Sequence, residues 1–323
     1  MKIVLDGYNK KIGKKDNQIV IYENDEIRDS IKASKINDIV ISGKGHVTFD
    51  ALNLMATNNI KMIGIDHIGH VNYILDAPNQ DNVFLKKQQY LLSENEKGIK
   101  IATEIIKSKI INQKSTLKTL NKNKKSKRVS GNILKITQYL KELENLDKMQ
   151  IMGIEGKCSV EYWKGVKTLL PNEVNFNGRT QQPTDLVNSM LNYGYAILAS
   201  EITKYITLSG LDPYCGFLHY DLNKRTSLTF DLIEEFRQQI VDKSVFSLIN
   251  NRQISNNDLD KRNNLIKLDA RIKIVKKILD KIYSSVTYNG ETLMYSEIIE
   301  LQTKKLVSAI LDNQDYVGFH LHW

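Results

Sequence analysis

The sequence has few of the residues and runs that mark secreted and membrane proteins. Its 323 residues include only two cysteines, Cys158 and Cys215, which are too few for a disulfide framework. They are not spaced as CxxC, which argues against a thiolate metal site, and we expect both to be small buried residues. No run approaches about 18 uninterrupted apolar residues, so we expect no transmembrane helix.

The N-terminal segment, MKIVLDGYNKKIGKK, lacks a long apolar stretch and a small-residue cleavage site. Signal peptides need both, so we expect a mature cytoplasmic N-terminus. Proline is also scarce: all four prolines lie from Pro78 to Pro213, outside the segments with helical periodicity. With 41% hydrophobic and 26% charged residues, the composition is that of a globular protein with one large or two moderate domains.

The first 80 residues have the pattern of a small β-rich domain. Short segments rich in β-branched residues alternate with Gly, Asn and Asp turns, which is typical of strands. The predicted strands are MKIVLDG, QIVIYEN, DIVISG, HVTF, IKMIGID and VNYIL, and FDALNLMATNN is the one predicted helix among them. We interpret this region as a β domain with one helix rather than a βαβ repeat.

From Asn82 onward the periodicity becomes helical, with apolar residues recurring at helical spacing. The predicted helical segments are NVFLKKQQYLLSENEKGIKIATEIIKSKIINQ, VSGNILKITQYLKELEN, GIEGKCSVEYWKGVKTL, TDLVNSMLNYGYAILASEITKYI, LDARIKIVKKILDKIYSSV and YSEIIELQTKKLVSAILDN. Pro78, in DAPNQDN, marks the predicted boundary. The predicted fold class is α+β, with a β-rich domain at 1–80 and an all-α domain at 81–323.

Much of the positive charge lies in one segment of the chain, whose net charge is +9. Between Ile105 and Lys141 there are eleven Lys or Arg residues and no Asp or Glu. The densest part, LKTLNKNKKSKR, contains Lys122, Lys124, Lys125, Lys127 and Arg128. Each neutralised phosphate releases counterions, so we favour nucleic-acid binding over a merely solvated surface. A membrane surface is less favoured, because no strongly apolar face accompanies these charges.

A group of potential metal ligands lies in GFLHYDLNKRTSLTFDLIEEFR. Drawn as a helix, DLIEEFR places Asp231, Glu234 and Glu235 within one sector of about 100°, opposite an apolar face. Like charges that close repel unless a cation neutralises them, as Arg237 or a divalent metal would. Taken alone, this segment is more typical of a solvated acidic face, and a lone His219 is more often a core histidine.

Glu155 adds a third potential ligand. It lies close between two glycines in GIEGKCSVEYW, which leaves its side chain open to a ligand, at a predicted helix N-terminus. The helix dipole favours a carboxylate there, and that preference alone would also explain the residue. Together, Glu155, His219 and Glu234 would form an O, N, O ligand set suited to Mn²⁺ or Mg²⁺, with positions left for a phosphate oxygen and water.

Several of these segments, in this order, resemble the Cas1 (Cas-one) family of CRISPR spacer-acquisition integrases. The resemblance rests on GIEGKCSVEYW, NFNGRTQQPTDLVNSMLNYGYAIL, SGLDPYCGFLHYDLNKRTSLTFDLIEEFR and the C-terminal YNGE followed by SEIIELQTKKLVSAI. It covers essentially the whole chain, including the order of the two domains. It implies a metal-dependent DNA integrase in which Glu155, His219 and Glu234 are the catalytic metal ligands and Asp231 supports the site.

The resemblance also implies a reaction and partners. The 3′-hydroxyl of a short DNA fragment, the spacer precursor, attacks a phosphodiester at the edge of a CRISPR repeat, and a metal ion stabilises the developing charge. The same chemistry in reverse would cut branched DNA. The family is expected to form a homodimer through the β domain, with a Cas2 (Cas-two) dimer bridging two such dimers.

Other residues have weaker assignments. Arg179, Lys224 and Arg225 are candidate phosphate contacts, although a simple basic turn explains the last two equally well. Asn188 and Tyr195 fit the family pattern, and we favour support of the site over direct chemistry for both. The segment RTQQPTD has fewer basic residues than the family usually has there, which leaves its DNA contacts open.

Two alternatives to an integrase remain. The same three ligands would serve a metal-dependent, structure-specific DNA endonuclease, in which water replaces the DNA 3′-hydroxyl as the nucleophile. The other alternative is a non-catalytic, basic DNA-binding scaffold. The ligand set argues against it, because a scaffold does not need three matched ligands.

Overall fold

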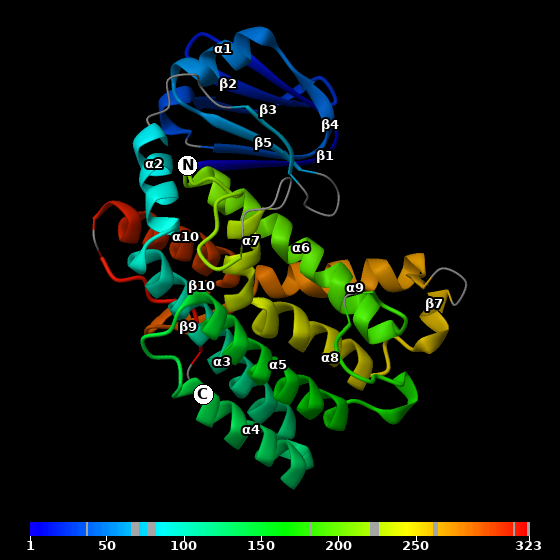
Figure 1. The fold of residues 1–323 in the computed structure, drawn as a ribbon. Helices are drawn as coiled ribbons and strands as arrows, with labels where there is room; N and C mark the ends of the chain where they lie inside the picture. The colour runs from blue at the N-terminus through cyan, green and yellow to red at the C-terminus, as the bar shows by residue number, and fades with distance from the viewer. Residues whose placement is uncertain are drawn as a thin grey trace.

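The computed structural model describes residues 1–36, 38–65, 71–75, 82–180, 182–219, 226–260, 264–312 and 314–321. A β-sheet region comes first, and a larger, mostly helical region follows it (Figure 1). This confirms the predicted α+β class. The predicted boundary at Pro78 lies outside the described residues, so the division at residue 80 stays a prediction.

The β region is one mixed sheet with strand order β3-β2-β1-β4-β5-β6. Its elements are β1 (Lys2–Lys15), β2 (Gln18–Glu23), β3 (Glu26–Lys32), β4 (Asp38–Val47), α1 (Phe49–Thr57), β5 (Lys61–Ile65) and β6 (Val71–Leu75). β4 pairs in parallel with both β1 and β5, and α1 connects β4 to β5. The region therefore contains one βαβ unit, with β1 as a further parallel neighbour of β4, and no second unit is present among its described strands. The outer pairs, β3–β2, β2–β1 and β5–β6, are antiparallel.

Two strand predictions were wrong. β3 was missed because most of its residues are exposed and polar, and such an edge strand carries no apolar period. HVTF is not a separate strand, because β4 continues through Gly43 and Gly45 to Val47. An added Cβ at either glycine would lie 1.9 Å from a carbonyl oxygen of β1, that of Gly7 or of Lys10. The two glycines therefore allow β1 and β4 to pair along their length.

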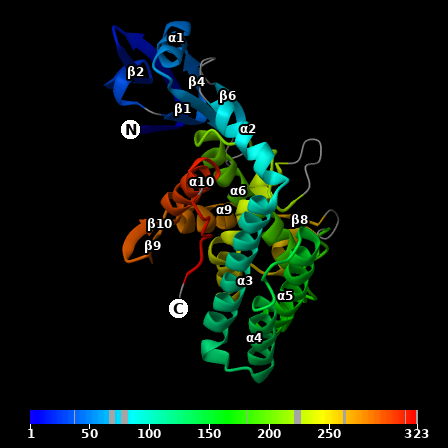
Figure 2. The ribbon, with the colours of Figure 1, turned by 60° about the vertical axis from the view of Figure 1, so that its left-hand side comes forward.

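The helical region packs around one large apolar cluster, separate from the smaller cluster under the sheet. Its elements are α2 (Asn82–Ser93), α3 (Glu96–Lys124), α4 (Lys127–Leu140), α5 (Lys148–Leu169), α6 (Leu186–Leu208), α7 (Ser227–Leu232), a 3-10 turn (Ile233–Glu235), a π-helical turn (Gln238–Asp242), α8 (Lys243–Asn250), β7 (Leu259–Asp260), β8 (Leu265–Ile266), α9 (Leu268–Ile282), β9 (Ser285–Tyr288), β10 (Glu291–Met294) and α10 (Tyr295–Leu311). α3 is the longest of these helices and runs beside α4 and α5 (Figure 2).

Two helical segments differ from the prediction in ways that affect the site. The segment predicted to run unbroken from Asn82 divides into α2 and α3, because the Asn95 side chain caps α3 by accepting from the backbone N–H of Lys97 and Gly98. α5 begins at Lys148, earlier than predicted. Glu155 is therefore about two turns inside the helix rather than at its N-terminus.

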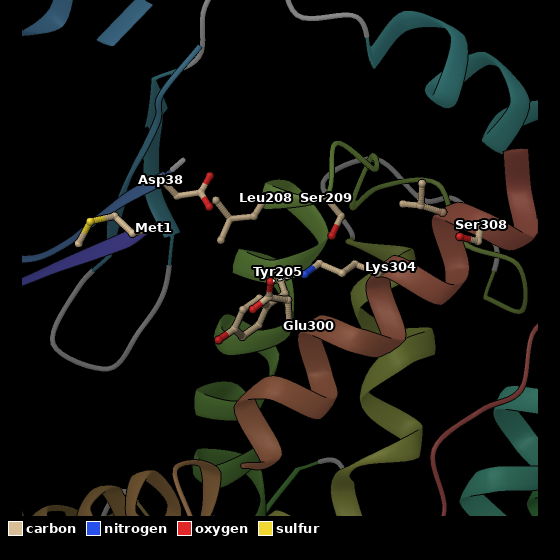
Figure 3. A pocket seen from close by; sticks show the side chains of 9 residues that line it. Met1, Asp38, Tyr205, Leu208, Ser209, Glu300, Lys304 and Ser308 are labelled. Atoms are coloured by element: carbon tan, nitrogen blue, oxygen red, sulfur yellow. Dashed lines mark ion pairs between the residues drawn. The ribbon is translucent and has the colours of Figure 1, made fainter. Parts of the chain in front are cut away.

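The two regions are in contact. The buried Lys61 Nζ on β5 donates a hydrogen bond of 2.9 Å to the carbonyl oxygen of Thr207 on α6. A cavity of about 530 Å³ lies between Met1 and Asp38 on one side and α6 and α10 on the other (Figure 3). Across the parts of the chain that the structure describes, no helix combines the length and apolar character needed to cross a membrane. Cys158 and Cys215 are buried free thiols, as predicted.

Candidate active site

The segment with the predicted acidic ligands is not one regular helix. α7 passes into the 3-10 turn, and the π-helical turn precedes α8, so the rotation per residue changes along the segment. Asp231, Glu234 and Glu235 are all buried, but they contact three different sets of residues. The prediction of one shared acidic face was therefore wrong, because it assumed a constant helical pitch.

Asp231 fixes the position of His219. Its Oδ1 lies 2.6 Å from His219 Nδ1, and its Oδ2 accepts from the backbone N–H of Phe217 at 2.6 Å and of Leu218 at 3.0 Å. A carboxylate can only accept, so Nδ1 carries the proton in this pair and the lone pair of the neutral ring lies on Nε2. Metal-binding histidines are commonly oriented in this way by a carboxylate on the other ring nitrogen.

Glu155 of α5 and Glu234 meet at Lys109 of α3. Lys109 Nζ lies 2.5 Å from Glu155 Oε1 and 2.7 Å from Glu234 Oε2, and the lysine side chain is only 8% exposed. Burial alone would lower the pKa of this ammonium, but the charges of Glu234 and Glu155 raise its pKa above the ordinary value. Two carboxylates from separate elements thus share one buried cation.

Lys109 was not singled out by the sequence analysis. In a segment with eleven basic residues, one more lysine carries no distinct signal. Its place in the helical period was the available clue, since it follows Ile105 by four residues and Ile106 by three, on the buried face of α3. A buried lysine on an apolar helix face needs an anionic partner, and here it has two.

Glu155 owes its charge to Lys109 rather than to a helix terminus. Burial raises the pKa of this carboxyl, but the Lys109 charge and hydrogen bonds from Lys109 and Ser159 outweigh burial and lower the pKa below its usual range. The predicted openness around Glu155 is present, since a Cβ added at Gly153 or Gly156 would meet nothing within 4 Å.

Two arginines lie near the Tyr195 ring, and one of them, Arg237, pairs with Glu234. Arg237 Nη1 lies 2.9 Å from Glu234 Oε1, and its guanidinium lies 4.8 Å from the centroid of the Tyr195 ring. Arg179 also approaches that ring, at 5.5 Å, and donates to Asn188 Oδ1 at 3.0 Å. Asn188 and Tyr195 thus contact the arginines, and the supporting role expected for both stays a prediction.

Five of the residues described above line one pocket of about 850 Å³. His219, Glu234, Arg237, Arg179 and Tyr195 all line it. The pocket combines a fixed imidazole, a carboxylate and two guanidiniums, and its volume is typical of a site for a nucleotide-sized group. Guanidinium groups bind phosphate through paired hydrogen bonds, so the pocket suits a phosphodiester beside an acidic centre.

The predicted ligands do not form a closed metal cage. Within the described parts of the chain, no three His, Cys, Asp or Glu side chains lie close enough together to hold a metal ion. Lys109 instead occupies the cation position between Glu155 and Glu234. The donor types still fit a hard divalent cation, because two carboxylates face one positive charge and an oriented imidazole lines the same pocket as Glu234.

Glu235 lies outside this site. Its carboxyl accepts hydrogen bonds from Tyr316 Oη at 2.6 Å, Gln302 Nε2 at 3.0 Å and the Phe319 backbone N–H at 2.7 Å. Burial raises the pKa of this carboxyl to about 7, although the three donors oppose the rise. Glu235 therefore links the 3-10 turn to α10 and the C-terminal segment.

The predicted DNA-binding lysines and arginines lie in several places. Lys224 and Arg225 fall outside the described residues. The other group, which we call the basic tip, is exposed at the end of α3 and the start of α4 and consists of Lys122, Lys124, Lys125, Lys127 and Arg128. At about 1.5 Å per helical residue, the tip begins roughly 20 Å along α3 from Lys109.

Comparison with known proteins gives one family. The family model described as CRISPR associated protein Cas1 matches residues 3–282. The chain is 53% identical to "CRISPR-associated protein Cas1 3" of Methanobrevibacter ruminantium and 36% identical to "CRISPR-associated endonuclease Cas1 1" of Archaeoglobus fulgidus. Both alignments cover 100% of this chain and 100% of the relative.

Solved structures with the same fold include a casposase bound to an integration product, with a TM-score of 0.81 and 25% identity over 98% of this chain and 97% of that chain. A chain from a partial Cas6-RT-Cas1–Cas2 complex matches with a TM-score of 0.80 and 21% identity, over 100% of this chain and 99% of that one. The second likeness is evidence for the fold alone.

Proposed function

We propose that this chain, a CRISPR nuclease and integrase, performs its chemistry with a divalent cation held by Glu155, His219 and Glu234. The chain belongs to the Cas1 family. The observation that carries the proposal is the meeting of Glu155 and Glu234 at one buried cation position. A buried carboxylate, Glu234, and a half-buried one, Glu155, that face one point are costly unless a positive charge occupies it.

Each residue of the site would have its own role in the reaction. Asp231 keeps the proton on His219 Nδ1, which leaves Nε2 for the metal. Arg237 and Arg179 face the pocket, where they would hold the phosphates of the DNA strand and orient the reacting phosphodiester. When bound, Mn²⁺ or Mg²⁺ supplies a Lewis acid for the phosphoryl oxygen.

The substrate of the proposed reaction is DNA. The 3′-hydroxyl of a short fragment attacks a phosphodiester at the edge of a CRISPR repeat, and the repeat strand's own 3′-oxygen leaves. The casposase that resembles this chain is bound to an integration product, which supports strand joining. The relative from A. fulgidus is named an endonuclease, which supports the cutting reaction, in which water is the nucleophile.

The proposed assembly follows the family. The β region would form a homodimer, and a Cas2 dimer would bridge two of these dimers to hold both ends of a spacer precursor. The basic tip would bind the phosphates of the captured DNA, because its exposed cations have the density that polyphosphate binding needs.

A strand-joining assay tests the proposed function. The purified chain, with and without a matching Cas2 protein, is incubated with short 3′-hydroxyl DNA, a plasmid carrying its repeat array, and Mn²⁺ or Mg²⁺. We expect joined product at the repeat edges, and we expect Glu234→Gln to reduce the rate by a factor on the order of 1,000. The matched control is Glu104→Gln, a glutamate of α3 that pairs with Lys107 outside the site.

Each outcome is informative. Cutting without joining would support the endonuclease and reject the integrase. Joining that survives Glu234→Gln would reject the assigned metal site. DNA binding with neither joining nor cutting, in the presence of Cas2 and either metal ion, would support the non-catalytic scaffold.

A further inference from the structure

Lys109 gives the acidic pair a cation that belongs to the protein. Its Nζ contacts Glu155 Oε1 and Glu234 Oε2 at 2.5 and 2.7 Å. The other oxygen of Glu234 is paired with Arg237 at 2.9 Å, and Glu155 Oε1 also accepts from Ser159 Oγ at 2.8 Å. Each oxygen of Glu234 therefore lies within ion-pair distance of a protein cation, and one oxygen of Glu155 accepts from Lys109 and Ser159.

The charges of this cluster already balance. Glu155 and Glu234 contribute two negative charges, and Lys109 and Arg237 contribute two positive charges. A divalent cation bound between the two glutamates would lie within contact distance of the Lys109 ammonium. Like charges at that separation repel strongly in a buried site, so the ammonium and the metal cannot share the pair.

The Lys109 ammonium can move to a different partner. Its ammonium is a point charge on a flexible four-carbon stem, so it can change partners while its backbone stays fixed in α3. A DNA phosphate bound in the pocket beside Glu234 and Arg237 would bring the negative charge that the displaced ammonium needs. Metal, phosphate and lysine would then form a balanced cluster.

We propose that Lys109 is an internal counter-ion that closes the metal-free site, and that its ammonium leaves Glu155 and Glu234 for a DNA phosphate when a divalent cation binds. This inference rests on the proposed metal site. Its consequence is that Mn²⁺ and DNA bind cooperatively. A DNA phosphate stabilises the ammonium away from the two glutamates, and the metal displaces the ammonium toward the phosphate. The chain would thereby keep its nuclease chemistry off until DNA is in place.

Mn²⁺ binding measured directly tests the inference without any assay of activity. The electron paramagnetic resonance signal of free Mn²⁺ is titrated with the whole protein, with and without a short duplex that ends in 3′-hydroxyls. For the natural chain we expect DNA to tighten Mn²⁺ binding by about tenfold or more. For Lys109→Met we expect binding without DNA to tighten by about tenfold, and the effect of DNA to shrink, because the competing charge is gone.

Lys107→Met is the matched control. Lys107 lies two residues earlier on α3, is 46% exposed and pairs with Glu104 rather than with the site. It should bind Mn²⁺ as the natural chain does. Lys109→Arg is a second variant, which keeps the charge, and it should keep the dependence on DNA.

Thermal unfolding covers the case in which Lys109→Met is poorly folded. Without the lysine, Glu155 and the buried Glu234 face each other with no cation between them, so we expect a lower Tm that Mn²⁺ raises by more than it does in the natural chain. Mn²⁺ binding to Lys109→Met that is equal to or weaker than binding to the natural chain, with no larger rise in Tm, would overturn the inference. Glu234→Gln distinguishes the proposed metal site from the proposed role of Lys109. If this change leaves Mn²⁺ binding unaltered, the assigned metal site is wrong.

Discussion

Glu234 and Glu235 are neighbours in the chain, but the protein holds their carboxyl groups in opposite ways. Both are buried. Glu234 is paired with two cations, Lys109 and Arg237, whereas Glu235 is held by neutral donors, which include Tyr316. The 3-10 turn that carries both residues sends one side chain toward the pocket and the other toward the C-terminal segment.

The difference separates an exchangeable site from a fixed one. Cations that pair with a buried carboxylate can be replaced by another cation, including a metal ion, without leaving the acid alone. Neutral hydrogen-bond donors cannot be replaced in this way, and losing the acceptor leaves each donor buried without a partner. We therefore expect damage at Glu234 to appear in the chemistry and damage at Glu235 to appear in stability.

The largest expected effect on stability comes from Glu235→Ala. The change leaves the Tyr316 hydroxyl, the Gln302 amide and the Phe319 N–H without their shared acceptor. We expect the free energy of unfolding to fall by about 4 kcal/mol. For Glu234→Gln we expect a fall of less than about 1.5 kcal/mol, because Lys109 is still paired with Glu155. Urea denaturation of both variants measures the contrast, and equal losses would contradict it.

Glu235→Gln is the conservative control. The amide keeps one acceptor oxygen of similar shape, so part of the stability should return. A variant that recovers none of it would mean that the charge, rather than the hydrogen bonds, holds the C-terminal segment.

The sequence predicted what depends on local periodicity. The starts of α9 and α10 agree with the predicted segments, because their apolar residues recur at helical spacing and each helix ends at a polar turn. The start of α5 was missed because its capping box, Asp147 with Gln150, lies before the apolar pattern begins. β3 was missed because an exposed edge strand has no core-facing period.

The partners of the acidic residues could not be predicted in the same way. The donors to Glu235 come from α10 and the C-terminal segment, and Lys109 comes from a helix far earlier in the chain. Such contacts depend on how the elements pack, which spacing along the sequence does not specify. The family motif supplied the candidates Glu155, His219 and Glu234, but not the cation between the two glutamates.

Asp242 extends the comparison to pH. Its two oxygens accept from Tyr195 Oη at 2.6 Å and Tyr162 Oη at 2.7 Å, so it is a second acid with tyrosine donors. Burial raises the pKa of this carboxyl to about 6, although the tyrosines oppose the rise. Between pH 4 and 6 the folded state therefore keeps a proton that the unfolded state has lost, and this group's contribution to stability falls as pH rises.

The expected size of this pH effect is about 3 kcal/mol, since each unit of pKa corresponds to about 1.4 kcal/mol. The measurement is the difference in unfolding free energy between the natural chain and Asp242→Asn, taken at pH 4, 5, 6 and 7. The natural chain should lose stability relative to the variant up to about pH 6. Glu155 should behave oppositely, because its lowered pKa favours folding as pH rises. A difference that does not change with pH would contradict the assignment for Asp242.

The basic tip contrasts with these buried acids, because its cations are exposed. Replacing Lys122, Lys125, Lys127 and Arg128 together by Gln should weaken DNA binding and reduce its dependence on salt. If each residue neutralises one phosphate, the slope of log affinity against log salt should fall in magnitude by about 3 to 4.

The matched control replaces four exposed cations of another surface, Lys267, Arg271, Lys273 and Lys276, on and just before α9. It should leave the slope unchanged if DNA follows α3 toward the tip. The rate of strand joining at saturating DNA should stay the same in both variants, because neither set contacts Glu155, His219 or Glu234. Equal slopes for the two variants would mean that the charge of the whole molecule, and not the tip, attracts the DNA.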